Sequence, residues 1–181
     1  MLLLALAACG PATKEEAIGN AAVAAVEPTA ATITGPAPII LETGGLRLPG
    51  SSPPRTLTFD TPEATAIEAV TAALGSPATE RGVNEECGGG SLAFAAWRDN
   101  ITIWFLDSRF AGWENKGTLK TAGGVGIGSS RADVAALPGF EVGESTLGTE
   151  FSAGALNGIL ASAAPDAKVI HLWAGADCVF R

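Results

Sequence analysis

The aromatic residues of this chain are concentrated in one short stretch, and the pattern of that stretch is typical of consecutive β-strands. Six of the aromatic residues lie between Phe94 and Trp113. Polar breaks divide the stretch into three segments of ordinary strand length: 92–97, 101–106 and 109–113. The segment 101–106 (ITIWFL) carries large apolar side chains on both faces, because alternate residues of a strand point to opposite sides. We therefore expect three antiparallel strands, with 101–106 in the interior of a sheet.

Shorter strands are predicted ahead of this stretch. Residues 38–48 (PIILETGGLRL) contain two apolar runs separated by Gly44-Gly45, which favours two strands joined by a turn at these glycines. Residues 55–59 (RTLTF) alternate between polar and apolar side chains, as a strand with one buried face does. These segments predict additional β-structure at the start of the domain.

A well-marked helix is predicted directly after these strands. Thr61 is a suitable N-cap, Pro62 suits the first helical position, and Gly75 is a natural stop. Between them, apolar residues recur at helical spacing: Ile67, Val70 and Leu74. The sequence thus predicts a helix from about residue 62 to residue 74, followed by the aromatic strands.

The second half repeats this plan in a weaker form. Ser130 and Asp133 have the spacing of a capping box at the start of a short helix that Pro138-Gly139 would end. Residues 147–161 are ambiguous between strand and helix, whereas 169–173 (VIHLW) indicates a strand, and a further strand is expected at Cys178-Val179. The predicted fold class is α+β: an antiparallel sheet with two packed helices. The alternative of a tandem helix-plus-meander repeat would divide the domain 38–181 into subunits 38–121 and 122–181.

The N-terminus carries an apolar run that ends in Leu6-Ala7-Ala8-Cys9 and resembles a bacterial lipobox. The resemblance implies that residues 1–8 are a signal peptide remnant, that Cys9 is lipidated, and that the protein lies at the periplasmic face of the outer membrane, since Gly10 rather than Asp follows the cysteine. Residues 9–37 are rich in Ala and contain no aromatic residue, so we expect them to form a tether. The alternative is an apolar N-terminal segment with a chance cysteine.

The cysteine count is consistent with an exported protein. Assigning Cys9 to a lipid leaves Cys87 and Cys178, which an oxidising compartment would join as a disulfide. The alternative is a pair of buried free thiols. No metal site is expected, because His171 is the single histidine and the chain has no C-x-x-C motif.

Two helical segments resemble each other and those of a known group of proteins. Residues 69–77 (AVTAALGSP) and 132–140 (ADVAALPGF) each resemble the capped helix that packs on a β-meander in the beta-lactamase inhibitor protein and in small lipoproteins of the outer-membrane assembly machinery. The resemblance implies protein binding through the sheet and its loops. It implies no catalytic residue and no cofactor.

Composition and motifs disfavour several functional classes. The net charge of −8 disfavours nucleic-acid binding, which needs cations to replace counterions. The glycines at 123–128 lack the spacing of a phosphate-binding loop, and no G-x-S-x-G motif precedes a helix. We therefore expect a non-catalytic envelope lipoprotein that binds a protein or an envelope component. The alternatives are a small cell-wall enzyme that uses carboxylates and His171, and a structural lipoprotein with no partner of its own.

The strongest sequence candidates for a binding surface are three tryptophans of the aromatic stretch: Trp97, Trp104 and Trp113. Exposed tryptophan is a frequent anchor in protein interfaces. The competing interpretation is that these side chains form the core of a domain with few other large residues.

Overall fold

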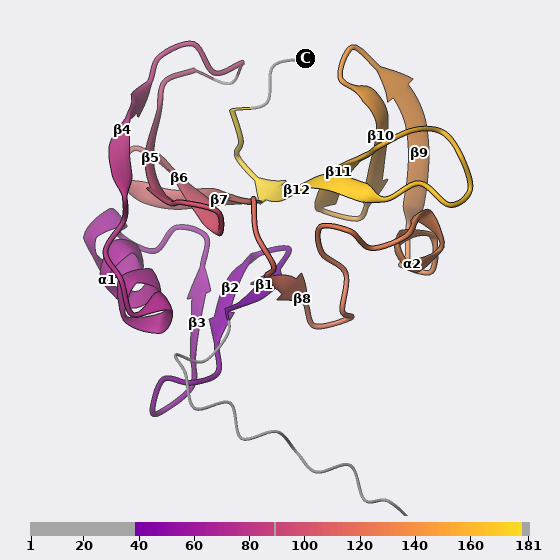
Figure 1. The fold of residues 1–181 in the computed structure, drawn as a ribbon. Helices are drawn as coiled ribbons and strands as arrows, with labels where there is room; N and C mark the ends of the chain where they lie inside the picture. The colour runs from indigo at the N-terminus through magenta and orange to yellow at the C-terminus, as the bar shows by residue number, and fades with distance from the viewer. Residues whose placement is uncertain (1–38, 89, 179–181) are drawn as a thin grey trace, which may run out of the picture. The chain divides into compact units, whose positions relative to one another are not determined.

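Two β-sheets form most of the fold. A computed structural model describes residues 39–88 and 90–178, so the predictions for residues 1–38, including Cys9 and the tether, lie outside the described residues. One sheet has eight strands and the other has four (Figure 1). The α+β class with antiparallel sheet is thus confirmed in its coarse form, although sheet dominates the fold.

The eight-stranded sheet consists of two four-stranded meanders that meet along β7 and β12. Its strands follow the order β4-β5-β6-β7-β12-β11-β10-β9, and every neighbouring pair is antiparallel. The first meander comprises β4 (Glu80–Asn84), β5 (Leu92–Trp97), β6 (Ile101–Leu106) and β7 (Arg109–Asn115). The second comprises β9 (Phe140–Ser145), β10 (Gly148–Ala153), β11 (Leu156–Leu160) and β12 (Val169–Gly175). Because β6 lies inside the sheet, the expectation for 101–106 is confirmed.

The smaller sheet contains the first three strands and one short later strand. It consists of β1 (Ile40–Glu42), β2 (Gly45–Leu48), β3 (Arg55–Thr58) and β8 (Lys120–Thr121), in the order β3-β2-β1-β8. The pair β1–β8 is parallel, whereas the other pairs are antiparallel. The predicted turn is one residue out of place, because Thr43 and Gly44 form it and Gly45 already pairs with Glu42.

Helix α1 (Glu63–Leu74) confirms the predicted helix, with a correction at its start. Pro62, not Thr61, occupies the N-cap position, and the Thr61 hydroxyl instead donates to the Thr58 carbonyl oxygen. The helix ends at Gly75 in the left-handed conformation (φ 69°), which glycine adopts without strain.

The second helix is too short to make the expected pair of packed helices. Helix α2 (Arg131–Ala135) has five residues, and its Ser130–Asp133 capping box is present as predicted. The ambiguous segment 147–161 forms the hairpin β10–β11, and Cys178 lies outside any strand. The prediction of two packed helices is therefore wrong, because after α2 the chain turns at once into the β9–β12 meander.

Three strands were missed at the level of sequence: β4, β8 and β9. The side chains of β4 and β9 are largely exposed because these strands form the two edges of the large sheet. Edge strands do not need a continuous apolar face, so no alternating pattern marks them. Strand β8 has two residues and is defined by its pairing with β1.

Candidate functional site

The register of the large sheet gives it one apolar face and, on the opposite face, a row of mostly polar residues. Residues that lie directly opposite each other on neighbouring strands point to the same side. On the face that we call the inner face, one such row runs through Ile103, Trp113, Ala174, Leu156, Ala153 and Phe140. On the other, the outer face, the adjacent row runs through Thr102, Glu114, Trp173, Asn157, Ser152 and Glu141.

The inner face packs against both helices and the small sheet. Its side chains share one buried cluster with Val70 of α1, Val134 of α2 and Leu41 of β1. Figure 1 shows α1, α2 and the small sheet on the same side of the eight-stranded sheet. The main core therefore lies on the inner side of the sheet, and the polar row on the outer face is not part of it.

The three tryptophans expected to form a binding surface are buried instead. Trp97, Trp104 and Trp113 are exposed to 3%, 7% and 0%, so the expectation of an exposed aromatic surface is wrong. Trp97 and Trp113 belong to the main core and donate their Nε1 hydrogens to the carbonyl oxygens of Ser76 (2.9 Å) and Glu42 (2.8 Å). The physical reason is the one given by the competing interpretation: a domain with few large residues uses them to fill its interior.

Glu114 is a buried carboxylate at the centre of the outer face. Its side chain lies 3.4 Å (Oε1) from the Lys116 ammonium nitrogen and 3.0 Å from His171 Nε2. The histidine contact has the distance but not the alignment of a hydrogen bond. Burial raises the pKa of Glu114, but the contacts with His171 and Lys116 together outweigh burial, so this pKa lies below its usual value. Glu114 is therefore a stable anion rather than a proton donor.

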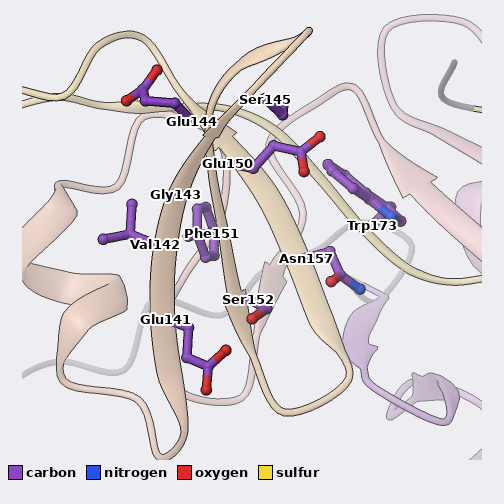
Figure 2. Close-up of a pocket in the computed structure, with 10 residues that line it drawn as sticks. All are labelled: Glu141, Val142, Gly143, Glu144, Ser145, Glu150, Phe151, Ser152, Asn157 and Trp173. Atoms are coloured by element: carbon purple, nitrogen blue, oxygen red, sulfur yellow. The ribbon is translucent and has the colours of Figure 1, made fainter. Parts of the chain in front are cut away.

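A hollow of about 390 Å³ adjoins this charged cluster on the second meander. We call it the outer hollow; ten residues line it: Glu141, Val142, Gly143, Glu144, Ser145, Glu150, Phe151, Ser152, Asn157 and Trp173. Figure 2 shows Glu141, Glu150 and Trp173 around the open space, with Val142 and Glu144 directed to the opposite side of β9. The His171 and Trp173 rings are in edge contact (5.1 Å between centroids), so the Glu114 cluster lies next to Trp173, which lines the hollow.

The hollow follows from side-chain size along the strands. Ser152 and Asn157 are shorter than Trp173 and Glu141 and lie between them, and Gly143, two residues from Glu141 on β9, has no side chain. A methyl group on Gly143 would meet no atom within 4 Å, which confirms the open space above it. Carboxylates, a carboxamide and a hydroxyl surround this space, so its chemistry suits a hydrogen-bonding or cationic group.

The first meander has a different outer face, where a disulfide covers aromatic side chains. Cys87 and Cys178 are joined, as predicted, with their Cα atoms 4.7 Å apart. They form a small second cluster with Leu92 and Trp104, against which Phe94 and Ala176 pack. Trp104 Nε1 is buried and has no hydrogen-bond partner, at a cost of about 1–3 kcal/mol for a buried polar group.

Sequence reasoning missed the residues that make the outer face distinctive. The predicted strand 109–113 stopped one residue before Glu114, although the hairpin register would have placed Glu114 opposite Thr102, another polar residue. His171 was identified as the single imidazole, but its partners come from a strand far away in the sequence. Among the residues that the structure describes, no three His, Cys, Asp or Glu side chains are grouped as metal ligands would be.

The fold and site together define an antiparallel-sheet α+β protein with an apolar inner face and a polar, hollowed outer face. No protein-family model and no curated protein matches the sequence. The chain is similar to a solved structure described as the uncharacterized protein yfeY from Escherichia coli, with 15% identity and a TM-score of 0.49. The similarity covers 66% of this chain and 93% of that one. Within 39–88 and 90–178, no helix is long and apolar enough to cross a bilayer.

Proposed function

We propose that the protein is a non-catalytic cell-envelope lipoprotein that binds a partner protein through the outer face of its eight-stranded sheet. The observation that carries the proposal is the outer hollow, where the accessible end of the polar row, Asn157, Ser152 and Glu141, reaches solvent. The inner face is already covered by both helices and the small sheet, and Thr102, Glu114 and Trp173 on the outer face are buried, so the surface available to a partner is the β9–β11 part of the outer face.

The envelope location is supported by two features of the sequence. The Leu6–Cys9 lipobox supports attachment of the chain to a membrane through Cys9. The Cys87–Cys178 disulfide supports an oxidising compartment, because such bonds rarely persist where glutathione and thioredoxin keep thiols reduced. Both features fit the periplasmic face of an outer membrane.

The charge of the outer hollow indicates which partner surface fits it. Glu141 is exposed at its rim and Glu150 lies on the neighbouring strand, while the chain as a whole carries a net charge of −8. A partner that presents arginine or lysine side chains would be attracted to this face and oriented by it. The resemblance to helix-plus-meander inhibitors and assembly lipoproteins, which implies binding through the sheet, supports the same conclusion.

Site-specific crosslinking tests this proposal. A photoreactive amino acid at Glu141 should capture a protein in intact membranes, whereas the same amino acid at Glu68, exposed on α1, should capture little. Glu141→Lys should then weaken capture at Ser152, and Glu68→Lys should leave it unchanged. Equal capture at positions 141 and 68, or capture that is indifferent to both charge reversals, would contradict binding through the outer face.

Membrane attachment is tested separately. Cys9→Ser should move the protein from the membrane fraction to the soluble fraction, because the residue that receives the lipid is lost. The control is Cys178→Ser, which breaks the disulfide but keeps Cys9 and should leave fractionation unchanged. If the Cys9→Ser protein still fractionates with membranes, the lipobox interpretation is wrong.

The cell-wall enzyme is a second candidate because His171 and Glu114 are in contact. A carboxylate beside an imidazole can orient a general base. Against this candidate, Glu114 is engaged with Lys116 as well, and its lowered pKa makes it a poor acid. Peptidoglycan hydrolysis that disappears in His171→Gln would favour the enzyme and contradict a purely binding role.

A further inference from the structure

The segment Gly175–Cys178, which we call the strap, leaves β12 and crosses the outer face of the first meander. Gly175 adopts a positive φ of 75°, which turns the chain off the sheet. The backbone N–H of Ala176 then donates to the carbonyl oxygen of Ala111 (2.9 Å). Figure 1 shows the yellow segment directly after β12, residues 176–178, on the side opposite the helices. The strap is therefore a cover on the outer face rather than a continuation of the sheet.

The strap lies so close to β7 that the sheet must have a glycine beneath it. A Cβ atom at Gly112 would be 1.9 Å from the carbonyl oxygen of Ala176 and 2.5 Å from its nitrogen. Gly175 is paired with Gly112 across the β7–β12 joint. Gly112 thus leaves the space on β7 that Ala176 of the strap occupies.

The side chains beneath the strap form a cluster separate from the main core. Cys87, Leu92 and Trp104 are its buried members, and Phe94 lies against the Trp104 ring with 5.6 Å between centroids. The Cys87–Cys178 bond ties the end of the strap to the segment that follows β4. A cluster this small depends on its covalent link, because it buries few apolar side chains of its own.

Trp104 distinguishes this cluster from an ordinary core. The indole nitrogens of Trp97 and Trp113 both have carbonyl acceptors, whereas Trp104 Nε1 has none and is shielded from solvent. Exposure to water would satisfy this donor, so opening of the cover relieves an unfavourable burial. The disulfide opposes that opening.

We propose that the strap is a redox-released cover, which stays closed while Cys87 and Cys178 are joined and opens over Phe94 and Trp104 when the bond is reduced. The reductant is a dithiol. One of its thiolates attacks the Cys178 sulfur, which is the less buried of the two, and Cys87 leaves as a thiolate that takes up a proton. The second thiol of the reductant then resolves the mixed disulfide, so two electrons and two protons pass to Cys87 and Cys178 and the reductant becomes a disulfide.

Opening changes what the protein presents to its surroundings. The closed form presents the outer hollow, whereas the open form also exposes the rings of Phe94 and Trp104 and the indole N–H of Trp104. This inference does not depend on the proposed function, because the cover would open whether or not the outer face binds a partner. The test therefore measures the solvent accessibility of the side chains beneath the strap.

Oxidative footprinting of the full-length protein, with each tryptophan quantified by mass spectrometry, tests the proposal. After treatment with a dithiol reductant and alkylation of both thiols, modification of Trp104 should rise by at least about fivefold, as expected for local opening. Trp97 and Trp113, buried in the main core, are the internal controls and should change little. Unchanged protection of Trp104 after full reduction would overturn the proposal.

A variant without the bond separates local opening from unfolding. The double variant Cys87→Ser, Cys178→Ser should show the same increase at Trp104 without any reductant, together with an unchanged far-ultraviolet spectrum. If Trp97 and Trp113 become reactive as well, the disulfide holds the whole domain and the strap is not a separate cover. If Trp104 stays protected in the variant, the strap is held by other contacts; both results contradict the proposal.

Discussion

Replacing Gly112 with alanine should destabilise the oxidised protein by about 2–4 kcal/mol. The new Cβ would lie 1.9 Å from the Ala176 carbonyl oxygen, so the strap must move away from β7. Overpacking of this kind costs about 1–3 kcal/mol, and loss of the Ala176–Ala111 hydrogen bond adds about 0.5–1.5 kcal/mol. The disulfide prevents the strap from simply lifting off, so we expect the full cost in the oxidised form.

Guanidinium unfolding of the oxidised protein measures this effect, with Gly143→Ala as the matched control. Gly143 also lies in a strand of the large sheet, but its Cβ would meet nothing within 4 Å, so its substitution should be close to neutral. For a domain of this size the Gly112→Ala loss corresponds to a fall in Tm of roughly 5–15 °C. Reduction of the disulfide should lessen the difference between Gly112→Ala and wild type. Equal stability of the two alanine variants would refute the argument from close approach.

Three further predictions concern the charged cluster, a helix cap and the tryptophans. The pKa of Glu114 is below its usual 4.5, so as pH falls the unfolded state takes up the proton before the folded state does. The free energy of unfolding should therefore decrease as pH falls below about 4.5. Glu114→Gln should flatten this part of the pH dependence of the unfolding free energy. Ser130→Ala should cost about 1 kcal/mol in denaturant unfolding, since the α2 capping box is lost, and a cost near zero would show that the cap is dispensable. Trp104→Phe should cost about 1–2 kcal/mol less than Trp97→Phe by the same measurement, because only Trp97 has an acceptor for its indole nitrogen.

Prediction from sequence was most successful for features that depend only on residues close together in the chain. The turn at Asp107-Ser108 has positive φ at both residues (50° and 58°), which suits a two-residue hairpin between β6 and β7. Helix α1 carries its own stop at Gly75, and the Ser130–Asp133 cap is a local pattern. These features were predicted because the residues that form them are neighbours.

The candidate site could not be predicted in the same way, because its residues meet through strand order. Glu114 and His171 are brought together when β7 pairs with β12, and neither segment indicates that pairing. The burial of Trp104 depends on the strap, which comes from the far end of the described chain. The disulfide was the exception, since only two cysteines remained once Cys9 was assigned to a lipid.

The position of β12 has a consequence for the order in which the protein folds. Each meander is built from hairpins of neighbouring strands, whose contacts close quickly because little chain separates them. The pairing between the meanders, by contrast, joins residues that are far apart in the sequence: Asn115 with Leu172 and Gly112 with Gly175. A chain made from its N-terminus onward therefore completes the central seam of its large sheet only after β12 has emerged. Until then both β7 and β11 present an open edge, so the period before β12 arrives is when the chain is most exposed to wrong pairing with another copy.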